Sequence, residues 1–281
     1  MNWEWFDRWI NNANLLLIGV ILFAAMCLAA VVGILLKASR QGRGAAADAE
    51  GGQEGYIVSA VLGLLALLLG FTFSMATDRF DARRVLVLQE ANAVGTAYLR
   101  AQLLDAPHRQ RATDLLLRYT DNRIALAKAA PGGAEQRRLL ALNDGMLTDL
   151  WAATAAAFES IKGLDFSSSY VDSINEVINI DQARKTARLA RVPGEVFAAL
   201  FIYLVTTAGV LGYVMKGGRG HLAAIFLLLL LVLSLMLILD INRPMGGIVT
   251  ESQRPMEDLR KTLAAQPPAV FDRWRSTPGK P

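Results

Sequence analysis

The sequence contains, at residues 56–77, the uncharged stretch YIVSAVLGLLALLLGFTFSMAT, which ends directly against Asp78 and Arg79. A bilayer core of about 30 Å is crossed by a helix of about 20 apolar residues, because an α-helix rises about 1.5 Å per residue. This stretch is therefore long enough to cross a membrane, and the two charges mark the point where the helix leaves it.

Three further stretches have the same apolar character, at residues 15–36, 196–215 and 222–239. The whole-chain composition agrees, because 53% of the residues are hydrophobic and only 19% are charged. A soluble domain has little use for so much apolar sequence in blocks. We therefore expect an all-α membrane protein with four transmembrane helices per subunit and the lipid bilayer as its surroundings. Residues 1–77 hold the first helix pair, and residues 193–243 hold the second.

Residues 78–192, between the second and third stretches, predict a helical domain in water. They are rich in Ala, Leu, Arg and Gln, and apolar residues recur at steps of three and four without the alternation of strands. The first helix of this domain, through Val87, Ala91, Val94 and Tyr98, directly continues the second apolar stretch. Residues 244–281 predict a C-terminal helix and a tail.

The distribution of basic residues predicts the orientation. Four spans place both termini and residues 78–192 on the same side of the membrane. That side carries eight basic residues close to the spans, whereas the opposite loops carry fewer: the first set is Arg79, Arg83, Arg84, Arg184, Lys185, Arg188, Arg191 and Arg243, and the second is Lys37, Arg40, Arg43, Lys216 and Arg219. The positive-inside rule therefore favours cytoplasmic termini and a cytoplasmic middle domain. Charge beside spans also explains the net charge of +4 without a nucleic-acid partner.

The sequence lacks the motifs that carry common enzymatic chemistry. It has no GxSxG elbow, Walker loop, HExxH pair or CxxC pair. Cys27 is the single cysteine, and His108 and His221 lie far apart without ligand spacing. We expect no enzyme, no metal site and no cofactor. For Glu90, we expect a surface role or a structural pairing with an arginine of a neighbouring helix rather than acid–base catalysis.

The second apolar stretch carries small or weakly polar residues at steps of three and four. They are Ser59, Gly63, Ala66, Gly70, Ser74 and Thr77. Such a stripe lets two helix backbones approach closely in lipid. It also suits a helix that faces a water-accessible axis, where Gly63, Leu67 and Phe71, one turn apart, would form rings at a narrow constriction. Periodicity alone leaves both interpretations open and favours packing.

The stretch GFTFSMATDRFDAR at residues 70–83 resembles the second-helix signature of bacterial bestrophins. Further short motifs look like the bestrophin-like family known as a domain of unknown function: EANA at 90–93, YLR at 98–100, and DINRP at 240–244 followed by Gly247. The resemblance extends from about Tyr56 to Leu263. Within these motifs we expect structural roles for Glu90, Asn92, Arg100, Asp240, Arg243 and Pro244.

Bestrophins are pentameric ion channels with four spans per subunit, a helical cytosolic domain between the second and third, and cytosolic termini. The resemblance therefore implies a homopentameric ion channel of a bacterial plasma (inner) membrane, with inorganic ions passing along the second span. Carried over by position, the neck residues are Phe71, Leu67 and Gly63, although Gly63 is small where a bulky residue is expected. No acidic cluster after the fourth span reproduces the calcium clasp of animal bestrophins, so calcium gating is not expected.

The cytosolic end of this pore helix carries Asp78, Arg79 and Arg83, which would either set a local field for ions or form structural salt bridges. Because both signs of charge are present, the sequence favours neither anions nor cations. The alternative to a channel is a non-conducting membrane sensor or scaffold whose helical domain binds a partner. The tail at residues 271–280 would contact lipid headgroups or be disordered, and we expect disorder.

Overall fold

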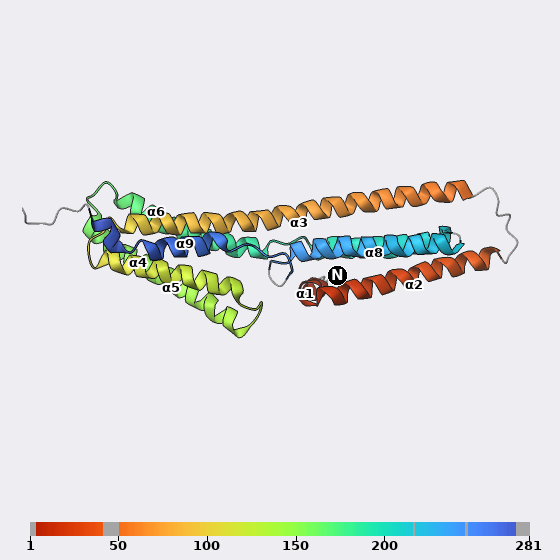
Figure 1. Ribbon diagram of the computed structural model, residues 1–281, viewed down its shortest axis with the longest axis horizontal. Helices are drawn as coiled ribbons and strands as arrows, with labels where there is room; N and C mark the ends of the chain where they lie inside the picture. The colour runs from red at the N-terminus through yellow and green to blue at the C-terminus, as the bar shows by residue number, and fades with distance from the viewer. Residues whose placement is uncertain (1–3, 42–50, 216, 245–246, 274–281) are drawn as a thin grey trace, which may run out of the picture. The chain divides into compact units, whose positions relative to one another are not determined.

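The computed structural model describes residues 4–41, 51–215, 217–244 and 247–273. Within these ranges the chain forms helices and no strand, as Figure 1 shows. The elements in chain order are α1 (Glu4–Asn12), α2 (Leu15–Gln41), α3 (Gly51–Ala101), α4 (His108–Lys128), α5 (Ala134–Ile161), α6 (Ser167–Leu189), α7 (Gly194–Val214), α8 (Gly217–Asn242), α9 (Arg254–Ala265) and the 3-10 helix η1 (Pro268–Asp272).

Four of the described helical segments are long and apolar enough to cross a membrane. Each of them overlaps one of the four predicted stretches, so the prediction of an all-α fold with four membrane helices is confirmed. The helices α2, α3 and α8 extend beyond the predicted limits. Hydropathy marks only the part of a helix that lipid surrounds, whereas the helix itself continues until its backbone hydrogen bonds are interrupted.

The helix α3 is 51 residues long and continues without a break from the second apolar stretch into polar sequence. This continuation agrees with the prediction from the sequence. The reason is local, because no proline occurs between Gly51 and Ala101 to remove an i→i−4 hydrogen bond. A turn follows Ala101, and Pro107 stands immediately before α4.

The chain divides into two compact units, which are described separately here. Unit 1 comprises residues 1–80 and 191–249, and unit 2 comprises residues 81–190 and 250–281. Unit 1 therefore holds α1, α2, α7, α8 and the first part of α3, and unit 2 holds the rest of α3 with α4, α5, α6, α9 and η1. That residues 78–192 lie in the cytoplasm stays a prediction.

Unit 1 is organised around a close crossing of α2 and α7. A Cβ atom on Gly33 would collide with the carbonyl oxygen of Gly209, and a Cβ atom on Gly212 would collide with the carbonyl oxygen of Ala30. Close backbone approach across small residues is how helices associate in lipid, where the hydrophobic effect between them is lost. The helix α8 packs beside α2 in the same unit (Figure 1).

The short helix α1 was not predicted from the sequence. Its apolar side chains Phe6 and Ile10 are buried in unit 1, and the ring of Phe6 contacts Phe201 of α7 edge-on, with 5.8 Å between centroids. The guanidinium of Arg243 donates to the backbone carbonyl oxygens of Ile10 and Ala13, the second at 2.9 Å. These contacts fix α1 against the ends of α7 and α8.

Unit 2 contains its own apolar core, in which α4 and α5 form an antiparallel hairpin (Figure 1). The break between them includes Pro131 and Gly133. The expectation of a disordered tail is wrong at its first residues. The ring of Phe271 lies 6.5 Å from that of Tyr98, and Asp272 pairs with Arg109 at 2.6 Å. Residues 274–280 of the predicted tail lie outside the described residues.

Candidate functional site

The predicted neck residues lie on the uncovered face of α3. Leu67 and Phe71 are 55% and 62% exposed, and Gly63 is exposed as well. The opposite face of the same helix is buried in the core of unit 1, through Val58, Leu65, Leu69, Thr72 and Ala76. The α3 helix therefore packs within its own chain through one face and leaves the predicted pore line free.

The small residues of the α3 stripe do not serve packing within this chain. A Cβ atom built on Gly63 or Gly70 would meet nothing within 4 Å. This differs from Gly33 and Gly212, whose lack of a side chain is required by the α2–α7 crossing. Ser59, Ala66 and Ser74 are also exposed, and Thr77 is half-buried. The stripe is thus available for a second copy of the chain, for lipid or for a pore.

The hydroxyl groups of the stripe are partly satisfied by the helix itself. Ser59 donates to the carbonyl oxygen of Gly55 at 3.0 Å, and Thr77 donates to that of Phe73 at 2.9 Å. Such bonds to the preceding turn let hydroxyl side chains face an apolar surrounding without an unsatisfied donor. Hydroxyls alone therefore do not require water on this face.

The three charged residues that were predicted to lie at the end of the second span differ in their surroundings. Asp78 is exposed and makes no hydrogen bond or ion pair with any described residue, and Arg79 is half-buried. In unit 2, Arg83 is 2% exposed, and its Nε lies 2.6 Å from Oε1 of Glu251. Arg83 therefore has a structural salt bridge, which is one of the two roles expected for these charges.

Glu90 is completely buried in unit 2 and is surrounded by donors. Its Oε1 accepts a hydrogen bond from the Tyr119 hydroxyl at 2.5 Å and lies 2.8 Å from Nε of Arg123. Its Oε2 accepts from the guanidinium of Arg184. An ionised carboxylate in an apolar interior needs such partners. The expected pairing of Glu90 with arginines of neighbouring helices is what the structure has.

A second buried carboxylate extends this network across α4, α5 and α6. Asp181 lies 3.2 Å from Arg123 and 2.8 Å from Lys185, and it accepts a hydrogen bond from the Asn143 amide at 3.0 Å. Arg123 thus bridges Glu90 and Asp181. We call the set Glu90, Tyr119, Arg123, Asp181 and Arg184 the buried ion-pair network.

The network changes the acidity of its tyrosine. Burial raises the pKa of Tyr119 well above its usual value, and the neighbouring Glu90 carboxylate raises it further because a phenolate there would face a like charge. Tyr119 is therefore a neutral hydrogen-bond donor throughout the neutral range. Nothing in this arrangement provides a proton-accepting group open to a substrate.

The motif at the end of α8 is also structural. The carboxylate of Asp240 accepts from the backbone N–H groups of Ile248 and Val249, each at 2.8 Å at its shortest contact. The side-chain oxygen of Asn242 accepts from the N–H of Val192 at 2.8 Å. Pro244 lies half-buried in the turn that follows α8. These bonds close the turn after α8 and tie it to the start of α7.

Two further motif residues lie on α3 within unit 2. Arg100 donates to the carbonyl oxygen of Ser169 at 2.5 Å and so holds the end of α3 against α6. Asn92 is exposed and lines a shallow groove of about 410 Å³ between α3 and α6, beside Asp172 and Glu176.

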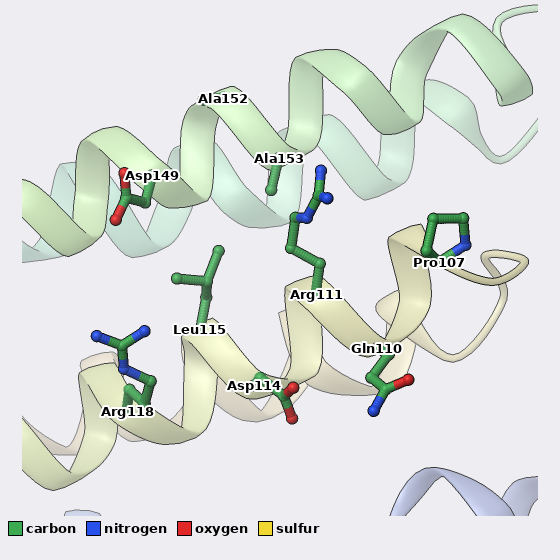
Figure 2. Close-up of a pocket in the computed structure, with 9 residues that line it drawn as sticks. All are labelled: Pro107, Gln110, Arg111, Asp114, Leu115, Arg118, Asp149, Ala152 and Ala153. Atoms are coloured by element: carbon green, nitrogen blue, oxygen red, sulfur yellow. The ribbon is translucent and has the colours of Figure 1, made fainter.

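A larger groove, of about 610 Å³, lies between α4 and α5 in unit 2. Figure 2 shows Arg111 and Leu115 of α4 directed toward Ala153 of α5, with Pro107 at one end of the groove. Its charged residues balance, since it is lined by two arginines and two aspartates: Arg111, Arg118, Asp114 and Asp149. It contains no nucleophile paired with a base, so it does not form a catalytic constellation.

Arg123 and Arg184 were not identified from the sequence as partners of Glu90, nor was Asp181 as the second partner of Arg123. A signal was present for Arg123, which follows the buried residues Leu116 and Tyr119 at helical steps and so occupies the apolar face of α4. A charged residue on an apolar face predicts a buried partner. The identity of that partner depends on tertiary structure.

Comparison with known proteins agrees with the family resemblance seen in the sequence. Residues 21–256 match the family model described as the bestrophin-like domain. A comparison with curated proteins finds no match by sequence.

Solved structures show the same fold. One is a variant of a bacterial bestrophin homologue from Klebsiella pneumoniae, with 17% identity and a TM-score of 0.67, and the alignment covers 90% of this chain and 98% of that chain. Another structure of a bestrophin homologue from Klebsiella pneumoniae has 18% identity and a TM-score of 0.60, with 87% and 95% covered.

Proposed function

The chain belongs to the bestrophin-like family, and we propose that it assembles into an oligomeric ion channel whose pore is lined by α3 and narrowed by a hydrophobic neck. The chain shares its fold with bestrophin homologues, and the bestrophin fold is known from ion channels. The proposal includes a homopentamer in a bacterial plasma membrane, with both termini and residues 78–192 in the cytoplasm.

The observation that carries the proposal is the uncovered line of Gly63, Leu67 and Phe71. A single chain leaves two large apolar side chains exposed there, next to glycines that no intrachain contact requires. In a cyclic oligomer with α3 nearest the axis, Leu67 and Phe71 would each contribute one side chain per subunit to an apolar ring. Such rings gate ion passage by excluding water from a narrow pore. At Gly63 the pore would be wider.

The rest of unit 1 supports α3 in this role. The side of α3 opposite the neck packs through Leu65, Leu69 and Ala76 into the core that also contains α2, α7 and α8. These side chains lack polar groups and are rigidly packed, so the neck positions are held by a fixed scaffold rather than by a loop. The buried ion-pair network has a corresponding structural role within unit 2.

The experiment that tests the proposal is ion flux through purified protein in liposomes. Phe71→Ala should raise the flux, because removal of the ring widens and wets the neck. The matched control is Leu230→Ala on α8, where the leucine is 60% exposed on a helix that the proposal does not assign to the pore. That change should leave the flux as in the unmodified protein.

The oligomeric mass, measured by native mass spectrometry in detergent, accompanies the flux assay. A pentamer that passes ions supports the proposal. An intact oligomer that passes no ions overturns it and favours the alternative, a non-conducting sensor or scaffold whose helical domain binds a partner. In that case the groove between α4 and α5 is the place to look for the partner.

A further inference from the structure

Arg188 is a half-buried arginine near the end of α6 in unit 2. It stands four residues after Arg184, and side chains four residues apart lie on the same face of a helix. Arg184 is buried and binds Glu90, so Arg188 continues the packed face of α6 by one turn. Unlike Arg184, Arg188 makes no hydrogen bond or ion pair with any residue in the part of the chain that the structure describes.

The carboxylates around Arg188 already have other partners. Glu90 and Glu251 attract Arg188, but neither forms an ion pair with it. Glu90 is held by Arg184 within the buried ion-pair network. Glu251 lies 2.6 Å from Nε of Arg83. Among the described residues, Arg188 is therefore the cation of this group that has no carboxylate of its own.

The surroundings of Arg188 disfavour its positive charge. Burial, together with the nearby guanidinium groups of Arg184 and Arg123, lowers the pKa of Arg188 to about 10. The side chain is still protonated at neutral pH, so a charge lies partly out of water without a counter-ion. Such a charge is costly unless a group of opposite sign reaches it. This part of unit 2 is therefore suited to hold an anion.

The end of α6 is also close in sequence to a membrane span. The helix α6 ends at Leu189, and α7 begins at Gly194. Six residues of chain separate Arg188 from Gly194, and they extend over at most about 20 Å. Leu189, directly after Arg188, is 80% exposed. An arginine beside an exposed leucine is a combination that suits the boundary between lipid headgroups and acyl chains.

We propose that Arg188 binds a phosphate group, carried either by an anionic phospholipid at the membrane surface or by free inorganic phosphate. The planar guanidinium presents two parallel N–H donors that match two phosphate oxygens, and its charge does not depend on pH in the physiological range. The anion would complete the charge balance that the carboxylates of unit 2 leave open. The site belongs to α6 rather than to the proposed pore line of α3, so it does not rest on ion conduction.

The experiment measures the midpoint of thermal unfolding of the full-length protein in detergent. Potassium phosphate is compared with potassium gluconate at equal ionic strength, and micelles that contain phosphatidylglycerol are compared with micelles that contain phosphatidylcholine. At several times the dissociation constant, the bound anion should raise the midpoint by about 2–4 °C. A rise with inorganic phosphate identifies a site for a soluble anion, whereas a rise with phosphatidylglycerol alone identifies a site for a lipid headgroup.

Three variants test the role of the side chain. Arg188→Gln should abolish the rise and, in gluconate, should unfold at no lower temperature than the unmodified protein, because it removes an uncompensated charge. Arg188→Lys keeps the charge without the planar fork and should keep only part of the rise. The matched control is Arg118→Gln, which removes an exposed and unpaired arginine of α4 and should keep the whole rise.

Three results would overturn the proposal. The first is a midpoint that neither inorganic phosphate nor phosphatidylglycerol raises. The second is a rise that survives Arg188→Gln, since the anion would then bind elsewhere. The third is a lower midpoint for Arg188→Gln in gluconate, which would show that the partner of Arg188 lies within the chain. None of these results bears on whether the protein conducts ions, which the flux assay tests separately.

Discussion

Arg123 and Glu90 form an ion pair inside unit 2, with Nε of Arg123 2.8 Å from Oε1 of Glu90 and with side chains that are 2% and 0% exposed. The two residues stand on α4 and α3, and Arg184 of α6 binds the second oxygen of the same carboxylate. One glutamate thus links three helices. Its removal would leave two guanidinium groups without that counter-charge in an interior that water does not reach.

Glu90→Gln should therefore destabilise the protein strongly. Breaking a buried ion pair by removing one partner costs about 3–5 kcal/mol, because the remaining charge stays desolvated. The measurement is the midpoint of thermal unfolding in detergent. Glu135→Gln is the control, since Glu135 pairs with Arg138 at 2.7 Å on the exposed surface of α5, and it should leave the midpoint unchanged. Equal midpoints for the two variants would contradict the role assigned to Glu90.

The raised pKa of Tyr119 predicts a loss of stability at alkaline pH. The folded pKa lies above the unfolded value of about 10, because burial and the Glu90 carboxylate both disfavour the phenolate. Its contribution is fully present below pH of about 10 and is lost as the pH rises through the folded pKa. Unfolding midpoints measured across the alkaline range should fall less steeply for Tyr119→Phe. An unchanged slope would show that Tyr119 is not linked to unfolding.

The helices and spans could be predicted from the sequence because they depend on local properties. Hydropathy over about 20 residues marks a span, and the apolar periodicity through Val87, Ala91, Val94 and Tyr98 predicted that α3 continues past Thr77. Helix α1 was missed since its nine residues are too few for a span. Its burial depends on contacts with Phe201 and Arg243, which are distant in sequence.

The candidate site was predictable in part. Periodicity identified the face of α3 with Gly63, Leu67 and Phe71, and the structure leaves that face uncovered by its own chain. Periodicity could not show that Asp78 is exposed whereas Arg83 is buried in a salt bridge, since both are charged residues at the same end of a span. Their difference arises from Glu251, which is 168 residues away from Arg83 along the chain.

Gly212→Ala should destabilise unit 1, whereas Gly209→Ala, one turn earlier on α7, should have a small effect. A Cβ atom at residue 212 would collide with the backbone of Ala30, but one at residue 209 would lie 3.5 Å from the carbonyl oxygen of Ala29, in ordinary contact. Overpacking of this kind costs about 1–3 kcal/mol. Thermal unfolding in detergent measures both variants. Equal midpoints for the two would show that the α2–α7 crossing is looser than described.

Gly247→Ala should weaken the turn after α8. The added Cβ atom would lie 2.7 Å from Oδ1 of Asp240, which accepts from the N–H groups of Ile248 and Val249. Displacing the carboxylate leaves those donors without an acceptor, at a cost of about 1–3 kcal/mol. Gly145→Ala is the control, because a Cβ atom there meets nothing within 4 Å on α5. It should stabilise the helix by about 0.5–1 kcal/mol. A fall in unfolding midpoint for both variants would contradict the assignment.

Cysteine accessibility should distinguish a pore face of α3 from a lipid face. Cys27 is the single cysteine, so Cys27→Ser gives a background without thiols. Phe71→Cys and Ser74→Cys should react with a charged, water-soluble thiol reagent and lose flux, because a thiol must ionise to react and water in a pore permits this.

Leu28→Cys on α2 is the matched comparison for this experiment. Leu28 is 67% exposed, similar to Phe71 at 62%, so exposure in the single chain does not separate the two positions. A thiol surrounded by lipid stays protonated, since burying a charge in hydrocarbon is costly, and Leu28→Cys should remain unmodified. If Phe71→Cys and Leu28→Cys were both unreactive in a folded oligomer, α3 would face lipid, and the pore would have to be sought on another helix.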